Sequence, residues 1–232
     1  MPRLFKIPTL WVLLIASMGC QEETIVPDTS RLGADFFPME KGLYWEYEVD
    51  LTTYNLLDSM PSHYFLREVV ADTFTDLSGS LSYRLERFSR ETANVDWQLD
   101  SVWTARLSTT QAVRIENNVP FIKLTFPLAE GKEWNGNALN NRGEETYQVS
   151  GLGVALEVGD TTFENTLTIL QREVLDTIVF QDVRREYFAK EIGLVKKEFI
   201  QLNYCSTEEC FGQKIIDSGR KLYMELVAHG KE

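Results

Sequence analysis

One short segment occurs twice in the chain, and this repeat constrains the fold more than any other feature of the sequence. Residues 37–45 and 126–134 both read F-P-x-x-x-G-x-x-W. Proline fixes φ and favours a turn, glycine permits a positive φ, and the tryptophan that follows can anchor a strand to a core. Each copy therefore predicts a turn that leads into a strand. We expect a single domain, 36–232, built from two related halves at about 36–124 and 125–229.

The glycines and tryptophans of the repeat are candidate structural residues. Gly42 and Gly131 are the expected turn glycines, and Trp45 and Trp134 are the expected anchors. A tryptophan in this position usually packs into a core, and the alternative is a stacking platform for a ligand. Two weaker matches, V-x-D-T and an aromatic residue two positions before alanine, also recur in both halves.

Short runs of alternating polar and apolar residues cover the chain after the first copy of the repeat. Residues 44–49 (YWEYEV) and 81–88 (LSYRLERF) are the clearest examples. Alternation in segments rich in Val, Thr, Tyr, Phe and Trp predicts half-buried antiparallel strands, of which we expect about ten. The best helical pattern is confined to residues 166–176. The fold class that this alternation predicts is all-β, mainly antiparallel, with little helix.

The first 19 residues have the organisation of a secretory signal peptide. Arg3 and Lys6 form a basic start, residues 7–18 are uncharged and mainly apolar, and Gly19 precedes Cys20. A membrane-spanning helix needs roughly 20 apolar residues, so this segment is too short to be one.

The end of this segment, Ser17-Met18-Gly19-Cys20, resembles the lipobox of bacterial lipoproteins. In that family the cysteine thiol is diacylated and becomes the first residue of the mature chain. The family prefers leucine where this chain has Ser17, and such relaxed lipoboxes are common in lipoproteins of the Bacteroidetes type. The resemblance implies that Cys20 is the lipidation site, a diacylglycerol cysteine with acyl chains such as palmitate. The alternative is an ordinary signal peptide that is cut near Gly19 and leaves Cys20 as a free thiol.

Residues 20–35 are expected to form a flexible tether, because they lack periodicity and contain Pro27 and Gly33. Lipoproteins that stay in the inner membrane carry aspartate directly after the cysteine. This chain has Gln21 there, so the resemblance implies the outer membrane. Glu22 and Glu23 also resemble a surface-export signal, or are two acidic residues of a solvated tether. The sequence leaves open whether the body faces the periplasm or the cell surface.

The charge balance argues against nucleic acid as a partner. The chain has 23 Lys and Arg residues against 35 Asp and Glu residues, a formal net charge of −12. Such a chain repels phosphate backbones. It also repels an anionic membrane surface, so the acyl chains rather than a basic patch would hold the protein at the membrane.

Cys205 and Cys210 are the remaining cysteines. An unpaired thiol is a liability in an oxidising compartment, and lipidation of Cys20 leaves these two as a pair. A disulfide between them would close a short loop between expected strands at 198–204 and 214–227. The alternatives are a zinc half-site, which lacks two further ligands, and a redox pair, which is more often C-x-x-C.

The sequence contains little that indicates catalysis. His63 and His229 are the only histidines, and neither has a metal-ligating partner two to four residues away. No nucleophile elbow, metalloprotease, phosphate-loop or calcium-loop motif occurs. The Glu-Glu pairs at 144–145 and 208–209 lie in polar segments, and their separation from other carboxylates cannot be read from sequence. We expect no catalytic residues, no metal site and no cofactor, so the protein is expected not to be an enzyme.

Three segments carry a wider resemblance: FFPMEKGLYWEYEV, FPLAEGKEWNGNALN and YFAKEIGLVKKEF. They resemble uncharacterised outer-membrane lipoproteins of the Bacteroidetes type, in which F-P-x-x-x-G-x-x-W and G-L-V-K recur. The likeness spans residues 36–200. It implies that the all-β fold is a twisted, curved sheet or an incompletely closed barrel, similar to that of LolA/LolB-type carriers, whose curved sheet holds lipid against an apolar concave face. The resulting hypothesis is a non-enzymatic lipoprotein that binds or carries an apolar ligand. The alternative is an envelope scaffold or protein-interaction module without a small-molecule ligand, whose partner is another envelope protein.

Overall fold

The computed structural model describes residues 32–56, 58–176 and 178–232. Cys20, the expected signal peptide and most of the expected tether lie outside the described residues. Within these ranges the chain is all-β, with one short 3-10 helix. No helix in the described residues is long and apolar enough to cross a membrane. The elements are η2 (Ala34–Phe36), β1 (Leu43–Asn55), β2 (Asp58–Thr75), β3 (Leu81–Arg90), β4 (Gln98–Leu107), β5 (Gln111–Glu116), β6 (Val119–Thr125), β7 (Glu133–Asn135), β8 (Thr146–Val158), β9 (Thr161–Val174), β10 (Phe180–Ala189), β11 (Gly193–Tyr204) and β12 (Ile216–Lys231).

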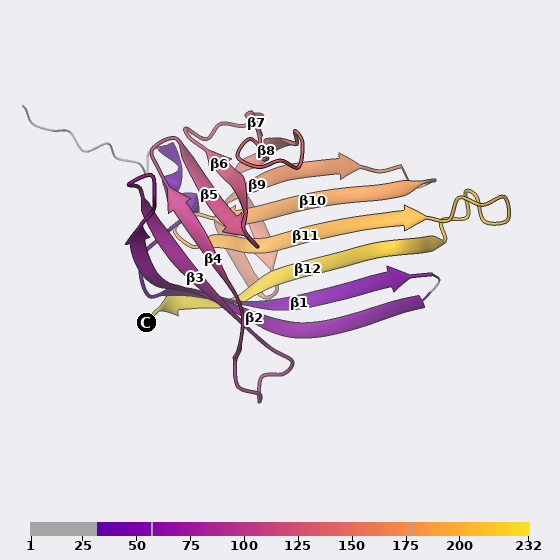
Figure 1. Cartoon of the computed structure of the whole chain (residues 1–232), viewed down its shortest axis with the longest axis horizontal. Coiled ribbons are helices and arrows are strands. Elements are labelled where there is room, and N and C mark those ends of the chain that lie inside the picture. The colour runs from indigo at the N-terminus through magenta and orange to yellow at the C-terminus, as the bar shows by residue number, and fades with distance from the viewer. Residues whose placement is uncertain (1–31, 57, 177) are drawn as a thin grey trace, which may run out of the picture.

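The strands of the described chain form one continuous sheet of twelve strands (Figure 1). Its order is β6-β5-β4-β3-β2-β1-β12-β11-β10-β9-β8-β7, and every neighbouring pair is antiparallel. Strands β1–β6 come from the first half of the chain and β7–β12 from the second. The halves are joined in the middle of the sheet, where β1 pairs with β12 along its whole length of 13 residues.

The two edge strands, β6 and β7, meet at a seam with few hydrogen bonds. The Ile122 amide donates to the Gly136 carbonyl at 2.9 Å, and the Trp134 indole donates to the Ile122 carbonyl at 2.9 Å. Asn140 adds a side-chain bond to the Pro120 carbonyl at 2.7 Å. Strand β7 has only three residues and cannot seal the edge by itself. The fold is therefore a barrel that is nearly closed, and the predicted all-β class with an incompletely closed antiparallel sheet is confirmed.

The two copies of the repeat make the same local structure. Gly42 and Gly131 both have positive φ, at 91° and 74°. The Gly42 amide donates to the Val70 carbonyl on β2, and the Gly131 amide donates to the Val149 carbonyl on β8, both at 2.9 Å. Strands β2 and β8 are the second strands of their halves, so each copy turns the chain and ties it to the equivalent strand.

Of the two weaker sequence matches, only one occupies equivalent strands in the two halves. Residues 103–105 lie on β4 and 187–189 on β10, which are the fourth strands of the two halves. The V-x-D-T match does not hold in this way, because 70–73 lies within β2 whereas 158–161 forms the turn between β8 and β9.

Apolar side chains fill one end of the barrel, and the segment around η2 covers that end. The core contains buried side chains from both halves, among them Phe37, Trp45, Val70, Leu85, Ala105, Ala112, Leu124, Val149, Leu167, Phe188, Val195 and Leu226.

The residues just before β1 belong to this folded body. Ala34 and Phe36 are buried, the Leu128 amide donates to the Leu32 carbonyl at 3.0 Å, and the Glu191 amide donates to the Asp35 carbonyl at 2.7 Å. The described part of the body thus includes the last residues of the segment expected to be tether, because their apolar side chains and carbonyls have partners in the barrel.

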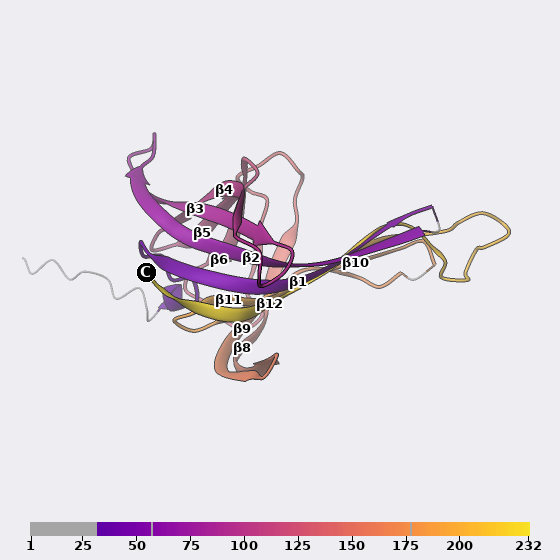
Figure 2. The same ribbon diagram turned by 90° about the horizontal axis from the view of Figure 1, so that it is seen from below.

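At the other end, long strands continue past the body as a narrow arm (Figures 1 and 2). The arm contains the ends of β1, β2 and β9–β12. Its turns are hydrogen-bonded to one another: the Leu56 amide donates to the Asp217 carbonyl and the Tyr204 amide donates to the Val179 carbonyl, both at 2.8 Å.

Candidate functional site

A continuous network of ion pairs crosses the inside of the barrel next to the apolar core. Its members alternate in charge from β3 to β11: Arg87, Glu68, Arg114, Glu116, Lys123, Glu186 and Lys197. Arg87 Nε lies 2.8 Å from Glu68 Oε1, and Glu68 also contacts Arg114.

The second part of the network joins the two halves of the chain. Lys123 Nζ on β6 lies 2.6 Å from Glu186 Oε1 on β10, and Lys197 on β11 lies 3.1 Å from the same oxygen. Lys123 also lies 3.3 Å from Glu116 Oε1. Strands β6 and β10 are not neighbours in the sheet, so this contact spans the interior.

A local irregularity places Lys123 inside. Strand β5 pairs Ala112 with Leu124 and Val113 with Ile122, which leaves Lys123 as the extra residue of a β-bulge. Bulges redirect side chains relative to the regular alternation of a strand. Lys123 is 5% exposed, and this is tolerable only because Glu116 and Glu186 face it.

The network holds its members in their charged forms. Burial by itself raises the pKa of Glu116, but attraction to Lys123, Lys197 and Arg114 outweighs burial and lowers the pKa to about 2.

The same balance applies to the other buried charges. The pKa of Glu186 and that of Glu68 are also lowered, in each case because nearby cations outweigh the effect of burial. The pKa of Lys123 is raised, since Glu116 and Glu186 outweigh its desolvation.

A cavity of about 520 Å³ lies beyond this network, on the side away from η2. Its walls come from the end of β5, from β6 and β8–β12, and from the segment that joins β7 to β8. Nine of its lining side chains are ionisable as cations or carboxylates: Lys123, Arg142, Arg172, Arg184, Lys197, Arg220, Glu116, Glu144 and Glu145. Cations predominate, although the whole chain carries a net charge of −12. Aromatic and apolar groups complete the wall: Phe121, Tyr147, Phe199 and Leu222.

Two of the cavity arginines are engaged by carboxylates. Arg184 Nη2 lies 2.6 Å from Asp182 Oδ2, and Arg172 Nε lies 3.0 Å from the same oxygen. Glu145 faces both guanidinium groups, at 3.2 Å from Arg184 and 3.6 Å from Arg172. These four side chains form a closed group without net charge.

Two other cavity arginines have no carboxylate partner in the described chain and pack against aromatic rings, one of which, Phe199, also lies 5.1 Å from the Arg184 guanidinium. The Arg142 guanidinium lies 5.5 Å from the centre of the Phe121 ring, and the Arg220 guanidinium lies 4.5 Å from that of Phe199. Among the described residues, no carboxylate oxygen lies within 4.0 Å of the nitrogens of Arg142 or Arg220. These cations are available at the mouth of the cavity.

The sequence alone does not indicate this cavity, and of its charged residues only the 144–145 pair stands out in the sequence. One signal was present, because Asp182, Arg184 and Glu186 alternate along β10 and so share the inner face of a strand. Such a pattern is normally assigned to a solvent-exposed face, and only the paired charges from other strands allow it to face inward.

The expected anchors are not among the residues that line this cavity. Trp45 is 6% exposed and its indole donates to the Ile192 carbonyl. Trp134 is half-buried, at the seam, and its ring packs edge-on against Tyr147 with ring centres 6.1 Å apart. Gly42 and Gly131 form the two turns described above.

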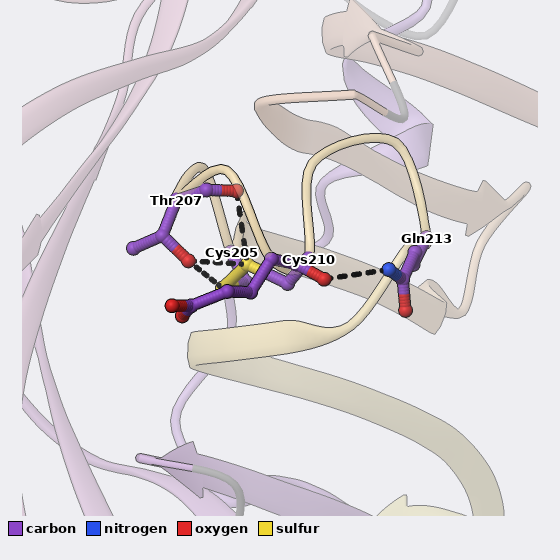
Figure 3. Close-up of a disulfide and its surroundings, with 5 residues drawn as sticks. Cys205, Thr207, Cys210 and Gln213 are labelled. Carbon is purple, nitrogen blue, oxygen red and sulfur yellow. Dashed lines mark hydrogen bonds between the residues drawn. A yellow bond between two sulfur atoms is a disulfide. The ribbon is translucent and has the colours of Figure 1, made fainter.

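Cys205 and Cys210 form a disulfide in the loop between β11 and β12, at the tip of the arm (Figure 3). The loop folds back on itself, with the Cys210 amide donating to the Thr207 carbonyl at 3.1 Å and the Gln213 amide donating to the Cys210 carbonyl at 3.0 Å. Neither cysteine is among the residues that line the cavity, so the disulfide closes the loop at the tip of the arm.

The other residues considered for chemistry are dispersed. His63 is on the surface, between Asp50 at 2.9 Å and Glu48 at 3.3 Å, and the hydrogen bond with Asp50 raises its pKa. His229 is exposed near the end of β12. The 208–209 pair is exposed in the disulfide loop. Within the described ranges, no group of three or more His, Cys, Asp or Glu side chains could hold a metal ion.

No known protein family matches the sequence, and no curated protein does. Three solved structures align with much of this chain, each at low identity. A Bacteroides fragilis protein described as exported, with a YmcC-like fold, has 13% identity and a TM-score of 0.46, covering 84% of this chain and 99% of that one. A protein described as a lipoprotein, from Parabacteroides distasonis, has 10% identity and a TM-score of 0.37, covering 84% and 98%. A DUF1329 family protein from Desulfovibrio piger has 13% identity and a TM-score of 0.25, covering 88% and 90%. These likenesses are too weak to transfer a family or a function to this chain.

Proposed function

We propose that this protein is a non-enzymatic lipoprotein of the outer membrane that binds an amphipathic ligand inside its barrel. Cys20 would be the lipid anchor. The observation that carries the proposal is the cavity of about 520 Å³ at one end of the barrel, opposite an end that is filled with apolar core. Ligand sites in proteins are typically concave and measure roughly 300–1,000 Å³. A barrel with one filled end and one hollow end has the shape that such binding needs.

The nature of the wall changes the ligand expected from sequence. The apolar inner face is occupied by core packing near η2, and the hollow part is lined mainly by charged side chains. A purely apolar ligand would desolvate these charges and would leave Arg142 and Arg220 without a counter-charge, which is costly. An amphipathic ligand can place its polar group among the cations and its apolar part against Phe121, Phe199 and Leu222.

The charge states of the site support binding rather than catalysis. A general acid or base works best when its pKa lies near the operating pH. Here the ion pairs move the pKa of Glu116 and Glu186 down and that of Lys123 up, away from neutral pH. Groups fixed in this way attract and orient a ligand but exchange protons poorly.

Native mass spectrometry of the full lipoprotein, extracted from its own membrane, tests the proposal. The expected mass is that of the chain from Cys20 with its acyl groups, plus a non-covalent adduct of the size of a small amphiphile. Leu222→Trp, which fills the cavity, should remove the adduct. Leu99→Trp, at an exposed position on β4, should retain it. An acylated protein without adduct, or an adduct that survives Leu222→Trp, contradicts the proposal.

The alternative role as an envelope scaffold has one observation in its favour. The arm ends in exposed apolar side chains, among them Leu56, Leu175 and Phe211, which are 75%, 60% and 58% exposed. If the scaffold role holds, the extracted lipoprotein carries a stoichiometric protein partner and no small adduct. Phe211→Ser should then release that partner, whereas Leu77→Ser, at an exposed turn between β2 and β3, should not.

A further inference from the structure

We propose that the ligand carries an oxyanion of the phosphate type, which Arg142 and Arg220 bind at the mouth of the cavity with Gln171 as a third donor. This inference rests on the proposed function and specifies the chemistry of the ligand. It follows from the charge that remains in the cavity after pairing, from a buried donor without a partner, and from the way in which the two arginines are held.

The cavity lining keeps positive charge after its ion pairs are counted. Arg172 and Arg184 are neutralised by Glu145 and Asp182, as described above. Lys123 and Lys197 are likewise balanced by the carboxylates of the buried network.

What remains in the lining is Arg142 and Arg220, opposed only by the exposed Glu144. The cavity mouth is therefore cationic within a chain of net charge −12. A concave site with one sign of charge concentrates ligands of the opposite sign.

The side chain of Gln171 also indicates a ligand in the cavity. Gln171 is the extra residue of a β-bulge in β9, because Arg184 pairs with Arg172 and Arg185 pairs with Leu170. It is 6% exposed and lines the cavity, and its Nε2 has no hydrogen-bond partner among the described residues. A buried amide donor without an acceptor is unfavourable, and a ligand oxygen in the cavity would supply the acceptor.

The orientation of Arg142 and Arg220 also suits the binding of an anion. Each guanidinium lies over a phenylalanine ring, Arg142 over Phe121 and Arg220 over Phe199. A stacked guanidinium keeps its in-plane N–H groups free to donate. Donors that come from different walls suit a tetrahedral oxyanion with several acceptor oxygens better than a planar, single-edged carboxylate. The same rings provide apolar surface beside the anion.

Binding of defined probes to the full lipoprotein in non-ionic detergent tests the inference by titration calorimetry. The probes are inorganic phosphate, an 18-carbon lysophosphatidic acid and a monoacylglycerol with the same chain. We expect lysophosphatidic acid to bind at a ratio of one to one, at least tenfold more tightly than monoacylglycerol. Tighter binding than inorganic phosphate identifies a lipid head group as the source of the anion, whereas equal binding identifies free phosphate.

Variants locate the anion. Arg142→Gln with Arg220→Gln should weaken binding of lysophosphatidic acid at least tenfold, and Gln171→Leu should weaken it several-fold. Neither change should alter binding of monoacylglycerol. Arg84→Gln is the matched control, because Arg84 is exposed on β3 and pairs only with Glu86 among the described residues. The two arginines of the double variant make no ion pair within the described chain, so it should keep the wild-type circular dichroism and melting temperature.

Three results overturn the inference. Monoacylglycerol could bind as tightly as lysophosphatidic acid, the double arginine variant could bind the anionic probe like wild type, or neither phosphate probe could bind. In each case the adduct found by native mass spectrometry still tests the proposed function separately. Loss of that adduct together with these results rejects both.

Discussion

Single residues at irregular positions set the character of the interior. Lys123 and Gln171 each occupy the extra position of a β-bulge, and both line the cavity. A regular strand would present every second side chain inward, whereas a bulge adds one inward side chain out of phase. Two of the polar side chains in the barrel therefore owe their inward positions to local interruptions of the alternation, whereas Asp182, Arg184 and Glu186 reach the interior by regular alternation along β10.

The buried pair between Lys123 and Glu186 predicts a large effect of a small change. Glu186→Gln leaves the buried Lys123 and the neighbouring Lys197 with one carboxylate fewer. Removing one partner of a buried ion pair typically costs about 3–5 kcal/mol, and we expect a loss of this order in the free energy of unfolding, measured in urea. Glu48→Gln, at a half-exposed surface pair with His63, should change it by less than about 1 kcal/mol. Equal effects of the two changes would show that the buried network adds no stability.

The same network predicts how stability depends on pH. The folded-state pKa of Glu68, Glu116 and Glu186 is lowered, so their contribution is present above the unfolded pKa of about 4.5 and is lost as pH falls through the folded values, about 2 for Glu116. The pKa of Tyr147 is raised to about 12 by burial, so its contribution is lost as pH rises above about 10.

We therefore expect these buried groups to leave the free energy of unfolding nearly constant from about pH 5 to 9, and the free energy to fall on both sides. Within this range the raised pKa of His63 adds only a small decrease as pH rises, because His63 is on the surface. Urea denaturation at closely spaced pH values measures it. A stability that decreases steadily between pH 8 and 5 would contradict this assignment.

At the scale of elements, the two turns of the repeat share a geometry but differ in their surroundings. A Cβ on Gly42 would lie 2.7 Å from the Glu232 carbonyl oxygen, whereas a Cβ on Gly131 would meet nothing within 4 Å. Both positions have positive φ. At Gly131 a side chain is thus disfavoured by the backbone conformation alone. At Gly42 it is disfavoured also by contact with Glu232, which follows β12.

This difference predicts unequal effects of the same substitution. Gly131→Ala should cost about 1 kcal/mol of unfolding free energy, from the left-handed conformation. Gly42→Ala should cost more, because the added methyl group also displaces the chain end. Removal of Glu232 should bring the cost of Gly42→Ala down to that of Gly131→Ala. If Gly42→Ala exceeds Gly131→Ala in cost by the same amount whether or not Glu232 is present, contact with Glu232 is not the cause.

At the scale of the whole molecule, the two junctions between the halves are very unequal. One junction is the long β1–β12 pairing, and the other is the seam at β6 and β7, with few hydrogen bonds. Curling of the sheet brings the cavity residues together, and the short β7 leaves its closure incomplete. The cavity lies beside this weaker junction, with Phe121 on β6 as part of its wall.

Amide hydrogen exchange should report this inequality. Amides of β1 and β12 that pair with each other should exchange only through global unfolding. The Ile122 amide, which bonds across the seam to Gly136, should exchange through a smaller opening and hence faster. The slope of the exchange free energy against denaturant concentration distinguishes the two openings. Equal slopes and rates at β1 and at Ile122 would show that the barrel opens only as one unit.

The sequence by itself determines those properties that depend on short stretches of chain. Alternation in residues 44–49 and 81–88 predicts strands, the repeated turn with Gly42 and Gly131 predicts two halves, and cysteine counting predicts the Cys205–Cys210 disulfide. Each rests on steric or chemical rules that act over a few residues.

Tertiary structure alone decides the candidate site. Arg142 and Arg220 lie far apart in the chain and reach one cavity only because the sheet curls and its edges meet. The inward positions of Lys123 and Gln171 depend on bulges, which follow from how neighbouring strands pair. An inward charge is stable only if opposite charges from distant strands face it, and no local pattern in a single sequence records that meeting. For this reason the sequence predicted the curved sheet, whereas the charged cavity within it became visible only in the folded chain.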